Sequence, residues 1–137
     1  MKKTFVDTFY IVALVNVRDE YHEKANDLVE IYDKQPLLVT DAVLLEIGNS
    51  LSRNYKQEAV EIFEEFFASP EVEIIRLDET LFDKAFEFYK NHADKTWGLV
   101  DCISFIVMKE HGITDALTCD KHFLQAGFRA LMLDSVN

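Results

Sequence analysis

Short apolar runs alternate with longer helical segments along the whole chain. The apolar runs, each expected to form one strand, cover residues 4–6, 36–40, 72–77, 113–118 and 128–133. A segment expected to be helical follows each of the first four runs, so neighbouring strands are joined by helical crossovers and run in the same direction. The alternation predicts an α/β fold of three layers, α/β/α, in which helices cover both faces of a mostly parallel sheet of about five strands.

The segment from Gly98 to His111 is expected to be a helix buried on most sides, because its apolar residues surround the helical wheel. Its polar exceptions, Asp101 and Ser104, are three positions apart and share one face. With Thr96 as the expected N-cap, Asp101 falls in the first turn, where the helix dipole favours an acid. For a single acid in this position, favourable interaction with the dipole alone is the commoner explanation.

Asp120 lies at the other end of the same crossover unit. The helix is expected to end at Gly112, and Asp120 follows the expected strand 113–118. In a strand, helix, strand crossover, the helix N-terminus and the carboxyl ends of both parallel strands lie at one edge of the sheet. Asp101 and Asp120 are therefore expected at this edge, where open parallel sheets bind ligands, and Asp115 is expected at the opposite edge.

Two more acids are candidates for the same edge. Asp7 follows the run 4–6, but a role as a helix cap explains it equally well on local grounds, since Asp is a favoured capping residue. Glu46 falls between apolar neighbours in the helical segment 41–53, with Asn49 on its side. A solvated helix face is the commoner explanation for such a polar patch.

Two further acids are explained as helix starts. Asp78 opens the helical segment 78–92, with Glu79 in the first turn, which is a standard start signal. Asp41 has a similar capping explanation at the start of its own helix. Neither acid is therefore expected to belong to a site.

The length and composition predict one domain, residues 1–137. The net charge of −11, from 14 basic and 25 acidic residues, argues against broad attraction to nucleic acid and favours a basic partner segment. Asp7 interrupts the apolar start and no small-residue cleavage site follows, so we expect no export signal and no membrane span. The expected location is therefore cytoplasmic. Cys102 and Cys119 are expected to be reduced core residues.

Convergence of Asp7, Glu46, Asp101 and Asp120 would create severe repulsion. Two carboxylates about 4 Å apart repel by roughly 4 kcal/mol at an effective dielectric near 20. Four such groups cannot all stay ionised in one place without a cation. An all-oxygen ligand set suits Mg²⁺, for which Mn²⁺ can substitute, and such an ion polarises a phosphate and generates a hydroxide nucleophile.

The chain resembles the PIN-domain family of metal-dependent ribonucleases, and in particular the VapC-like toxins of bacterial toxin–antitoxin pairs, over essentially its whole length. The resemblance lies in FVDTFYIVALV, in VTDAVLLEIGNSL and, most specifically, in LVDCISFIVMKEHGITDALTCDKHFLQAGF. It implies a catalytic and metal-binding role for Asp7, Glu46, Asp101 and Asp120. It makes Thr8, Asn49 and Ser104 candidates for supporting roles. Cys119 departs from the family pattern, because an aromatic residue is frequent there.

The same resemblance implies endoribonuclease activity on RNA, a homodimer, and a small antitoxin whose tail inserts basic side chains among the acids. Two alternatives stay open: a nuclease or phosphatase acting on DNA or another phosphate ester, and a non-catalytic binding module. Trp97 could stack an unpaired base, but packing in the core or in a dimer is favoured. His111 and His122 are expected to be structural.

Overall fold

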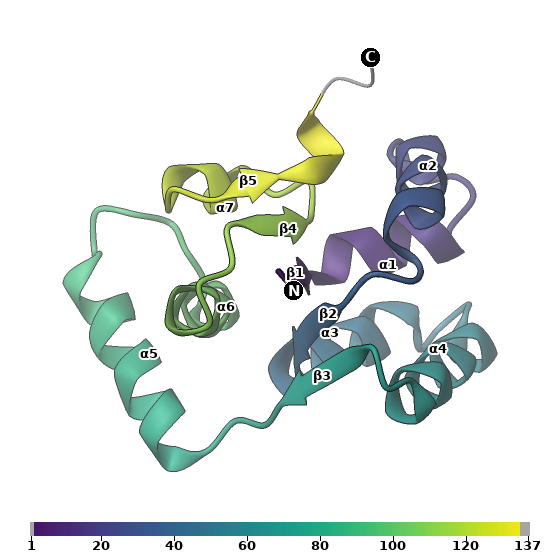
Figure 1. Cartoon of the computed structure of the whole chain (residues 1–137). Helices are drawn as coiled ribbons and strands as arrows, with labels where there is room; N and C mark the ends of the chain where they lie inside the picture. Colours follow the sequence, from purple (N-terminus) through teal and green to yellow (C-terminus); the bar gives the residue numbers. More distant parts are fainter. Residues whose placement is uncertain (1, 135–137) are drawn as a thin grey trace.

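Five short strands form one parallel sheet in the computed structural model, which describes residues 2–134 (Figure 1). The strands are β1 (Thr4–Val6), β2 (Leu37–Thr40), β3 (Val72–Ile75), β4 (Asp115–Leu117) and β5 (Arg129–Ala130). They lie in the order β3-β2-β1-β4-β5, and each neighbouring pair is parallel. The central strands β1 and β2 are buried along their whole length, as strands covered on both faces must be.

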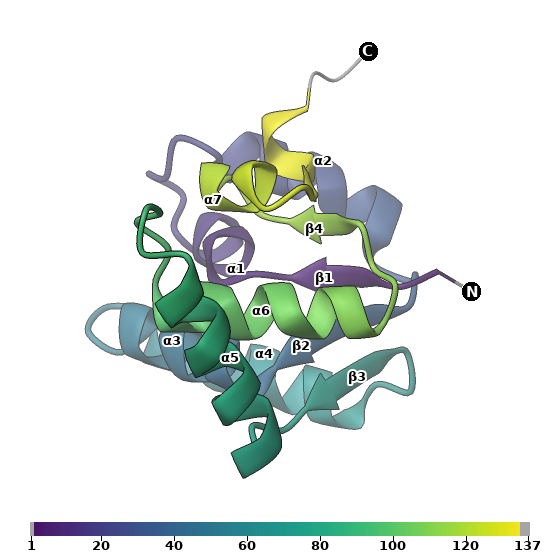
Figure 2. The same cartoon turned by 90° about the vertical axis from the view of Figure 1, so that its left-hand side faces the viewer.

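Helices cover both faces of this sheet. One layer consists of α1 (Thr8–Val15), α2 (His22–Tyr32), α3 (Asp41–Leu51) and α4 (Lys56–Ala68). The other layer consists of α5 (Glu79–Asn91), α6 (Leu99–Glu110) and the short α7 (Lys121–Gln125), which lie in front of the strands in Figure 2. The predicted three-layer α/β/α architecture is therefore confirmed. No helix within the described part of the chain combines the length and apolar composition that a membrane crossing requires.

The order in which the chain adds strands to the sheet reverses between β1 and β4. From β1 the chain builds β2 and then β3 on one side, and α5 and α6 carry it back across the sheet to form β4 on the other side. Phe5 lies opposite Ala116, and Val6 lies opposite Leu117. The carboxyl ends of β1 and β4 are therefore direct neighbours, and this is the position at which open parallel sheets form a binding crevice.

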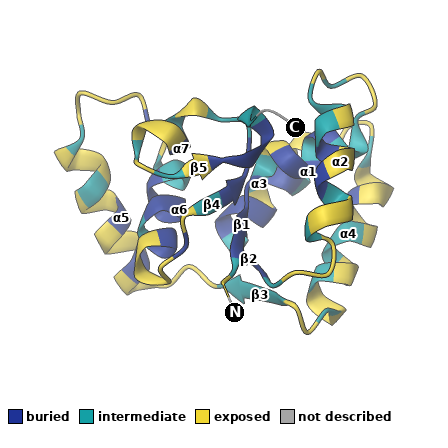
Figure 3. Cartoon of the chain, turned by 45° about the horizontal axis from the view of Figure 1, so that its top comes forward, coloured by how far each residue is buried: buried dark blue, intermediate teal, exposed yellow. Residues whose placement is uncertain are grey.

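An aromatic cluster anchors α6 against the sheet. The Phe105 ring is buried, and its centroid lies 5.1 Å from that of Trp97, 5.0 Å from that of Phe123 and 5.7 Å from that of Phe128. Trp97 is itself buried and stacks on Phe88 at 5.8 Å, so the expected packing role is confirmed and its ring is not free to stack a base. The middle of α6, from Cys102 to Phe105, is buried, and Figure 3 marks buried residues in dark blue.

Two predicted helix starts were wrong. The N-cap of α6 is Gly98 and not Thr96, because the Gly98 backbone N–H donates to Asp101 at 3.1 Å and closes the first turn there. The N-cap of α3 is Thr40, whose hydroxyl accepts from the Val43 N–H at 3.1 Å. Asp41 is instead the first helical residue, and its carboxylate accepts from the Leu77 N–H at 2.9 Å.

The last predicted strand was too long. Only Arg129–Ala130 pairs with β4, and the chain then turns into the 3₁₀ helix η1 (Leu131–Leu133). This turn buries Leu131 and Met132, and the Met132 N–H donates to the Thr118 carbonyl at 3.1 Å. Burial of apolar side chains in a turn has the same local pattern as a short buried strand, so the run 128–133 did not distinguish the two.

Replacement of Phe105 by Ala should lower the free energy of unfolding by about 3–5 kcal/mol, because it leaves a cavity among three aromatic neighbours. Urea denaturation followed by circular dichroism measures this change. The matched control is Phe67→Ala on α4, where the ring is 57% exposed and the expected change is at most about 0.5 kcal/mol. Equal losses in the two variants would contradict the assignment of Phe105 to the core.

Candidate metal-binding active site

Asp7 is buried at the carboxyl end of β1, with 5% of its surface exposed. It holds the N-cap position of α1 in an extended conformation, yet its side chain makes no capping hydrogen bond. Its carboxylate Oδ2 instead accepts from the Thr118 hydroxyl at 2.7 Å. Asp7 thus stands at the N-cap position, but its carboxylate makes no capping hydrogen bond and is held by Thr118 in the segment after β4.

Burial raises the pKa of Asp7 from its usual 3.8 to about 7. The hydrogen bonds from Thr118 and from the Thr8 backbone oppose this rise, because they favour the charged form. The nearby negative charges of Asp101 and Asp120 raise the pKa further. The site thus holds an acid that lacks enough nearby positive charge to offset its burial.

The Thr118 hydroxyl connects two of the acids. It is fully buried, donates to Asp7 and accepts from the Asp120 N–H at 3.0 Å. A hydroxyl can do both at once because it has one proton and two lone pairs. Thr118 therefore holds Asp7 at the end of β1 and the loop carrying Asp120 at the end of β4 in one arrangement.

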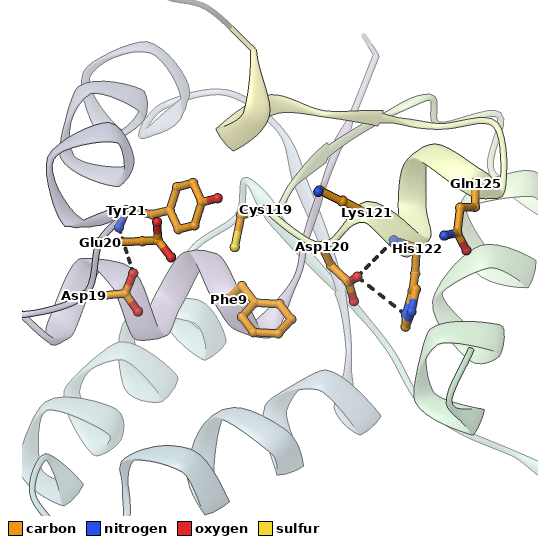
Figure 4. A pocket seen from close by; sticks show the side chains of 9 residues that line it. All are labelled: Phe9, Asp19, Glu20, Tyr21, Cys119, Asp120, Lys121, His122 and Gln125. Atoms are coloured by element: carbon orange, nitrogen blue, oxygen red, sulfur yellow. Dashed lines mark hydrogen bonds and ion pairs between the residues drawn. The ribbon is translucent and has the colours of Figure 1, made fainter. Parts of the chain in front are cut away.

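Asp101, Asp120 and His122 form a tight group beside Asp7. One possible ligand atom from each lies within 4.8 Å of the other two. The His122 Nδ1 lies 2.9 Å from Asp101 Oδ2, which is hydrogen-bond distance, and 3.5 Å from Asp120 Oδ1. Figure 4 shows the His122 ring beside Asp120. The Nε2 atom of the same ring is 3.2 Å from the Thr96 hydroxyl, which orients the imidazole.

The helix and loop geometry explains why these three side chains meet. Asp101 is the third residue of α6, and its Oδ2 also accepts from the Gly98 N–H. Asp120 is the N-cap of α7 and accepts from the His122 N–H at 2.9 Å. An acid at each of two helix N-termini is favoured by the helix dipoles, and this partly offsets the repulsion between the two carboxylates.

Glu46 is connected to the site through Thr8. The Thr8 hydroxyl donates to Glu46 Oε1 at 2.8 Å, and Thr8 directly follows Asp7 in the chain. Glu46 is not one of the three residues whose ligand atoms lie within 4.8 Å of one another. The structure thus brings the Glu46 carboxylate to the residue after Asp7, and the supporting role of Thr8 stays a prediction.

The other two expected supporting residues make no hydrogen bond to the acids within the described residues. The Ser104 hydroxyl is buried and donates to the Val100 carbonyl of its own helix at 3.1 Å. Asn49 is exposed on α3. Ser104 satisfies its hydroxyl locally because a Ser within a helix can reach the carbonyl one turn back, so the shared face with Asp101 did not produce a contact.

The acids that were assigned to other roles lie away from the site. Asp115 begins β4 at the opposite edge of the sheet, where its carboxylate is 3.7 Å from the Arg129 guanidinium. Asp78 caps α5 by accepting from the Leu81 N–H at 2.8 Å. Both predictions are confirmed, since the side chain of each acid has a structural partner.

Sequence reasoning missed Thr118 and underestimated His122. Thr118 directly follows the apolar strand β4, and its hydroxyl reaches Asp7 at the end of the neighbouring strand β1. Its position just after a predicted strand was the sequence signal that could have identified it. His122 follows Asp120 by two positions, and the N-cap turn of α7 brings its ring back toward the carboxylate. The contact of His122 with Asp101, 21 positions earlier, has no signal in the local sequence.

Both cysteines are free thiols, as predicted; Cys102 is buried in the core, whereas Cys119 is only half-buried. Burial raises the pKa of Cys102 and that of Cys119 to about 11. Since the thiolate is the nucleophile and the soft metal ligand, the two thiols do not contribute to the site at neutral pH. The candidate ligands are thus carboxylate oxygens and one imidazole.

A model of the PIN domain matches residues 4–129. The chain belongs to the PIN-domain family. The 23S rRNA-specific endonuclease VapC20 of Mycobacterium tuberculosis, from two strains, is 32% identical over 125 residues, which are 90% of this chain and 94% of VapC20. Its crystal structure, described as that of a toxin that cleaves the sarcin–ricin loop, superposes with a TM-score of 0.80 at 30% identity and covers 91% of this chain and 95% of that one.

A more distant structure confirms the fold alone. The crystal structure of FitAcB from Neisseria gonorrhoeae superposes with a TM-score of 0.65 at 17% identity, covering 93% of this chain and 95% of that one. The three-layer arrangement with a parallel sheet is therefore common to this PIN domain and to proteins with little sequence in common with it.

The raised pKa of Asp7 predicts a specific pH dependence of stability in the metal-free protein. Between about pH 4 and 7 the folded chain holds a proton on Asp7 that the unfolded chain has lost, so stability falls as pH rises through this window. At about 1.4 kcal/mol per unit of pKa, Asp7 alone accounts for a loss of up to about 4 kcal/mol. Asp7→Asn keeps the shape without the charge and should remove this loss.

Urea denaturation in EDTA at pH 5 and pH 8 measures the effect. Asp7→Asn should be more stable than the unmodified protein at pH 8, with a smaller difference at pH 5. The control is Asp78→Asn, which changes an exposed cap and should not become more stable than the unmodified protein at pH 8. An Asp7→Asn protein less stable than the unmodified one at pH 8 would contradict the cause assigned to this pKa shift.

Proposed function

We propose that this protein is a Mg²⁺- or Mn²⁺-dependent endoribonuclease that hydrolyses RNA phosphodiester bonds as the toxin of a toxin–antitoxin pair. The convergence of Asp7, Asp101 and Asp120 with His122 at the switch point of the sheet is the observation that carries the proposal. The choice of RNA over DNA rests on the related VapC20, which is named for cleavage of 23S rRNA. The whole chain is proposed to act as a single domain.

The chemistry of the residues fits a hard divalent cation. Asp7 is buried with a raised pKa, and Asp101 and Asp120 lie close enough to share one ion. Carboxylate oxygens are the ligands that Mg²⁺ and Mn²⁺ prefer, and an imidazole is more acceptable to Mn²⁺ than to Mg²⁺. We assign the ion to Asp7, Asp101 and Asp120, with Glu46 as a further ligand. When bound, it would offset the charge of these acids and polarise a phosphate.

The chain's own residues prepare the site for this role. Thr118 fixes the Asp7 carboxylate and the backbone of Asp120, so these oxygens need little reorganisation when a cation enters. The His122 ring occupies the space beside Asp101 and Asp120, where an Nδ1–H group donates a hydrogen bond to Asp101 Oδ2. Thr8 orients Glu46.

The remaining assignments rest on the family resemblance. A small antitoxin with a basic tail is proposed as the partner, because guanidinium groups pair bidentately with carboxylates and the protein carries a charge of −11. A homodimer is proposed, and the exposed apolar residues Phe82, Phe86 and Tyr89, which share one side of α5, are consistent with it. The protein is proposed to act in the cytoplasm.

Asp101→Asn should reduce RNA cleavage by at least about 100-fold while the protein stays folded, because the amide retains the shape but loses the charge of a metal ligand. Cleavage of total RNA at fixed Mn²⁺ measures the activity. The melting temperature supplies an independent readout: Mn²⁺ should raise it for the unmodified protein, and by less for Asp101→Asn. The rise should diminish as the pH is lowered, since metal binding needs deprotonated carboxylates.

The matched control is Asp115→Asn, an identical change at the opposite edge of the sheet, which should retain near-normal cleavage and the full response to Mn²⁺. Full cleavage by a folded Asp101→Asn protein would rule out the assigned site. A melting temperature that does not respond to Mn²⁺ or Mg²⁺ at neutral pH would argue for a non-catalytic binding module.

The partner is expected to copurify with the protein from its native host. A basic segment of that partner should block the site by pairing with the acids, so RNA cleavage at fixed Mn²⁺ should fall when the partner is present and recover when it is removed. Mass spectrometry of the purified complex identifies the partner. The antitoxin proposal would be wrong if native complexes contain no small basic protein, or if the partner leaves cleavage unchanged. Either outcome would leave the nuclease proposal in place.

A further inference from the structure

An open pocket of about 600 Å³ lies directly beside the acid group, between the loop after α1 and the start of α7 (Figure 4). Asp120 and His122 belong both to the wall of this pocket and to the proposed metal site. A ligand in the pocket would therefore lie next to a phosphate at the metal site. The assignment of a nucleotide base to this pocket rests on the proposed function.

The pocket presents an aromatic surface and free polar groups. Figure 4 shows Glu20 and Tyr21 on one side, Asp120 and His122 on the other, and Phe9 between them. Phe9 is in the first turn of α1, two positions after Asp7, and 48% of its surface is exposed. An exposed aromatic ring beside a site for phosphate chemistry suits stacking of an unpaired base.

Glu20 is the acceptor best placed to read such a base. Its carboxylate is exposed and makes no hydrogen bond or ion pair with any residue that the structure describes. The neighbouring Asp19 is already engaged, since its carboxylate accepts from the Tyr21 N–H at 2.9 Å and holds the loop. The loop is thus ordered by Asp19 and leaves the Glu20 carboxylate available to a ligand.

The net charge makes contacts to bases necessary. Nucleic-acid binding usually draws on Lys and Arg contacts to phosphates, but this chain carries 25 acidic and 14 basic residues. An RNA that approaches such a surface must gain affinity from the metal site and from stacking and hydrogen bonds to base edges. Stacking on an aromatic side chain contributes about 1–3 kcal/mol per base.

We propose that this pocket holds a guanine base of the nucleotide next to the cleaved bond, stacked on Phe9 and paired with the Glu20 carboxylate. Guanine presents two adjacent donors, N1–H and the 2-amino group, which match the two oxygens of one carboxylate. Adenine and cytosine each place an acceptor beside their amino group, and uracil flanks its single N–H with two carbonyls. Each of these edges would therefore set an acceptor against a carboxylate oxygen, which repels it.

Lys121 adds one positive charge to a pocket that the carboxylates of Asp19, Glu20 and Asp120 also line. Lys121 lines the same pocket and, within the described residues, its ammonium group has no ion pair. This positive charge would attract the phosphate attached to a bound nucleotide.

The first experiment measures base binding without any cleavage. Saturation-transfer NMR with guanosine, inosine and adenosine is performed on the intact protein in EDTA. Guanosine should bind at least about ten-fold more tightly than inosine, which lacks only the 2-amino group, because a hydrogen bond to a charged group is lost. Glu20→Gln should remove this preference, and Glu23→Gln, the same change outside the pocket, should retain it. Phe9→Leu should weaken binding of all three nucleosides by at least about five-fold, and Phe67→Leu should not.

The second experiment reads the same preference in cleavage. A random-sequence RNA pool is cut at fixed Mn²⁺, and the nucleotides on both sides of the new ends are sequenced. Guanine should be enriched at one of these positions for the unmodified protein and for Glu23→Gln, and the enrichment should disappear for Glu20→Gln or when inosine replaces guanine throughout the pool.

The outcomes separate the pocket from the proposed nuclease. Guanosine binding that depends on Glu20 supports the pocket even if no RNA is cleaved. The guanine assignment would be overturned, and the nuclease proposal kept, if RNA is cleaved, the unmodified protein binds the three nucleosides equally well, and Glu20→Gln cleaves with the same sequence preference as the unmodified protein. If Glu20→Gln loosens a basic protein partner and leaves nucleoside binding unchanged, the pocket binds protein and the guanine assignment is wrong.

Discussion

The hydrogen bond from the Thr118 hydroxyl to the buried Asp7 carboxylate is the interaction on which the site depends. An acid at 5% exposure, without an opposite charge to offset its burial, favours the protonated form, and the rise of its pKa to about 7 expresses this cost. Thr118 limits the cost and at the same time accepts from the Asp120 N–H. A single hydroxyl thus connects the carboxylate at the end of β1 with the backbone of Asp120 after β4, although the two carboxylates repel each other.

The position of α6 supplies the third acid. Its aromatic contacts through Phe105 hold the helix against the sheet, so the N-terminus of α6 arrives at the same edge as the ends of β1 and β4. Asp101 is then used twice, as the residue that closes the first turn at Gly98 and as a partner of His122. Core packing and site geometry are therefore coupled, because a shift of α6 would move a carboxylate relative to the other two.

The acidic surface has consequences for how such a protein can meet RNA. Long-range attraction to phosphates is weak for a chain with a charge of −11, so recognition must be short-ranged and concentrated near the site. A divalent cation among the acids would offset part of the local negative charge where a phosphate has to approach. The pocket beside Asp120 and the exposed ring of Phe9 then provide contacts that do not depend on net charge.

The alternation of strands and helices, which depends only on local periodicity, was sufficient to determine the layers, the parallel sheet and the edge at which Asp101 and Asp120 lie. It also separated Asp115 from these acids, since the two ends of a strand lie at opposite edges. Local sequence could not decide between capping and site roles for Asp7, because the deciding partner, Thr118, is 111 positions away. The contact of His122 with Asp101 and the opening of the pocket next to Phe9 likewise exist only after the sheet has brought distant segments together. Such contacts depend on the packing of whole elements, which residue spacing within one segment does not encode.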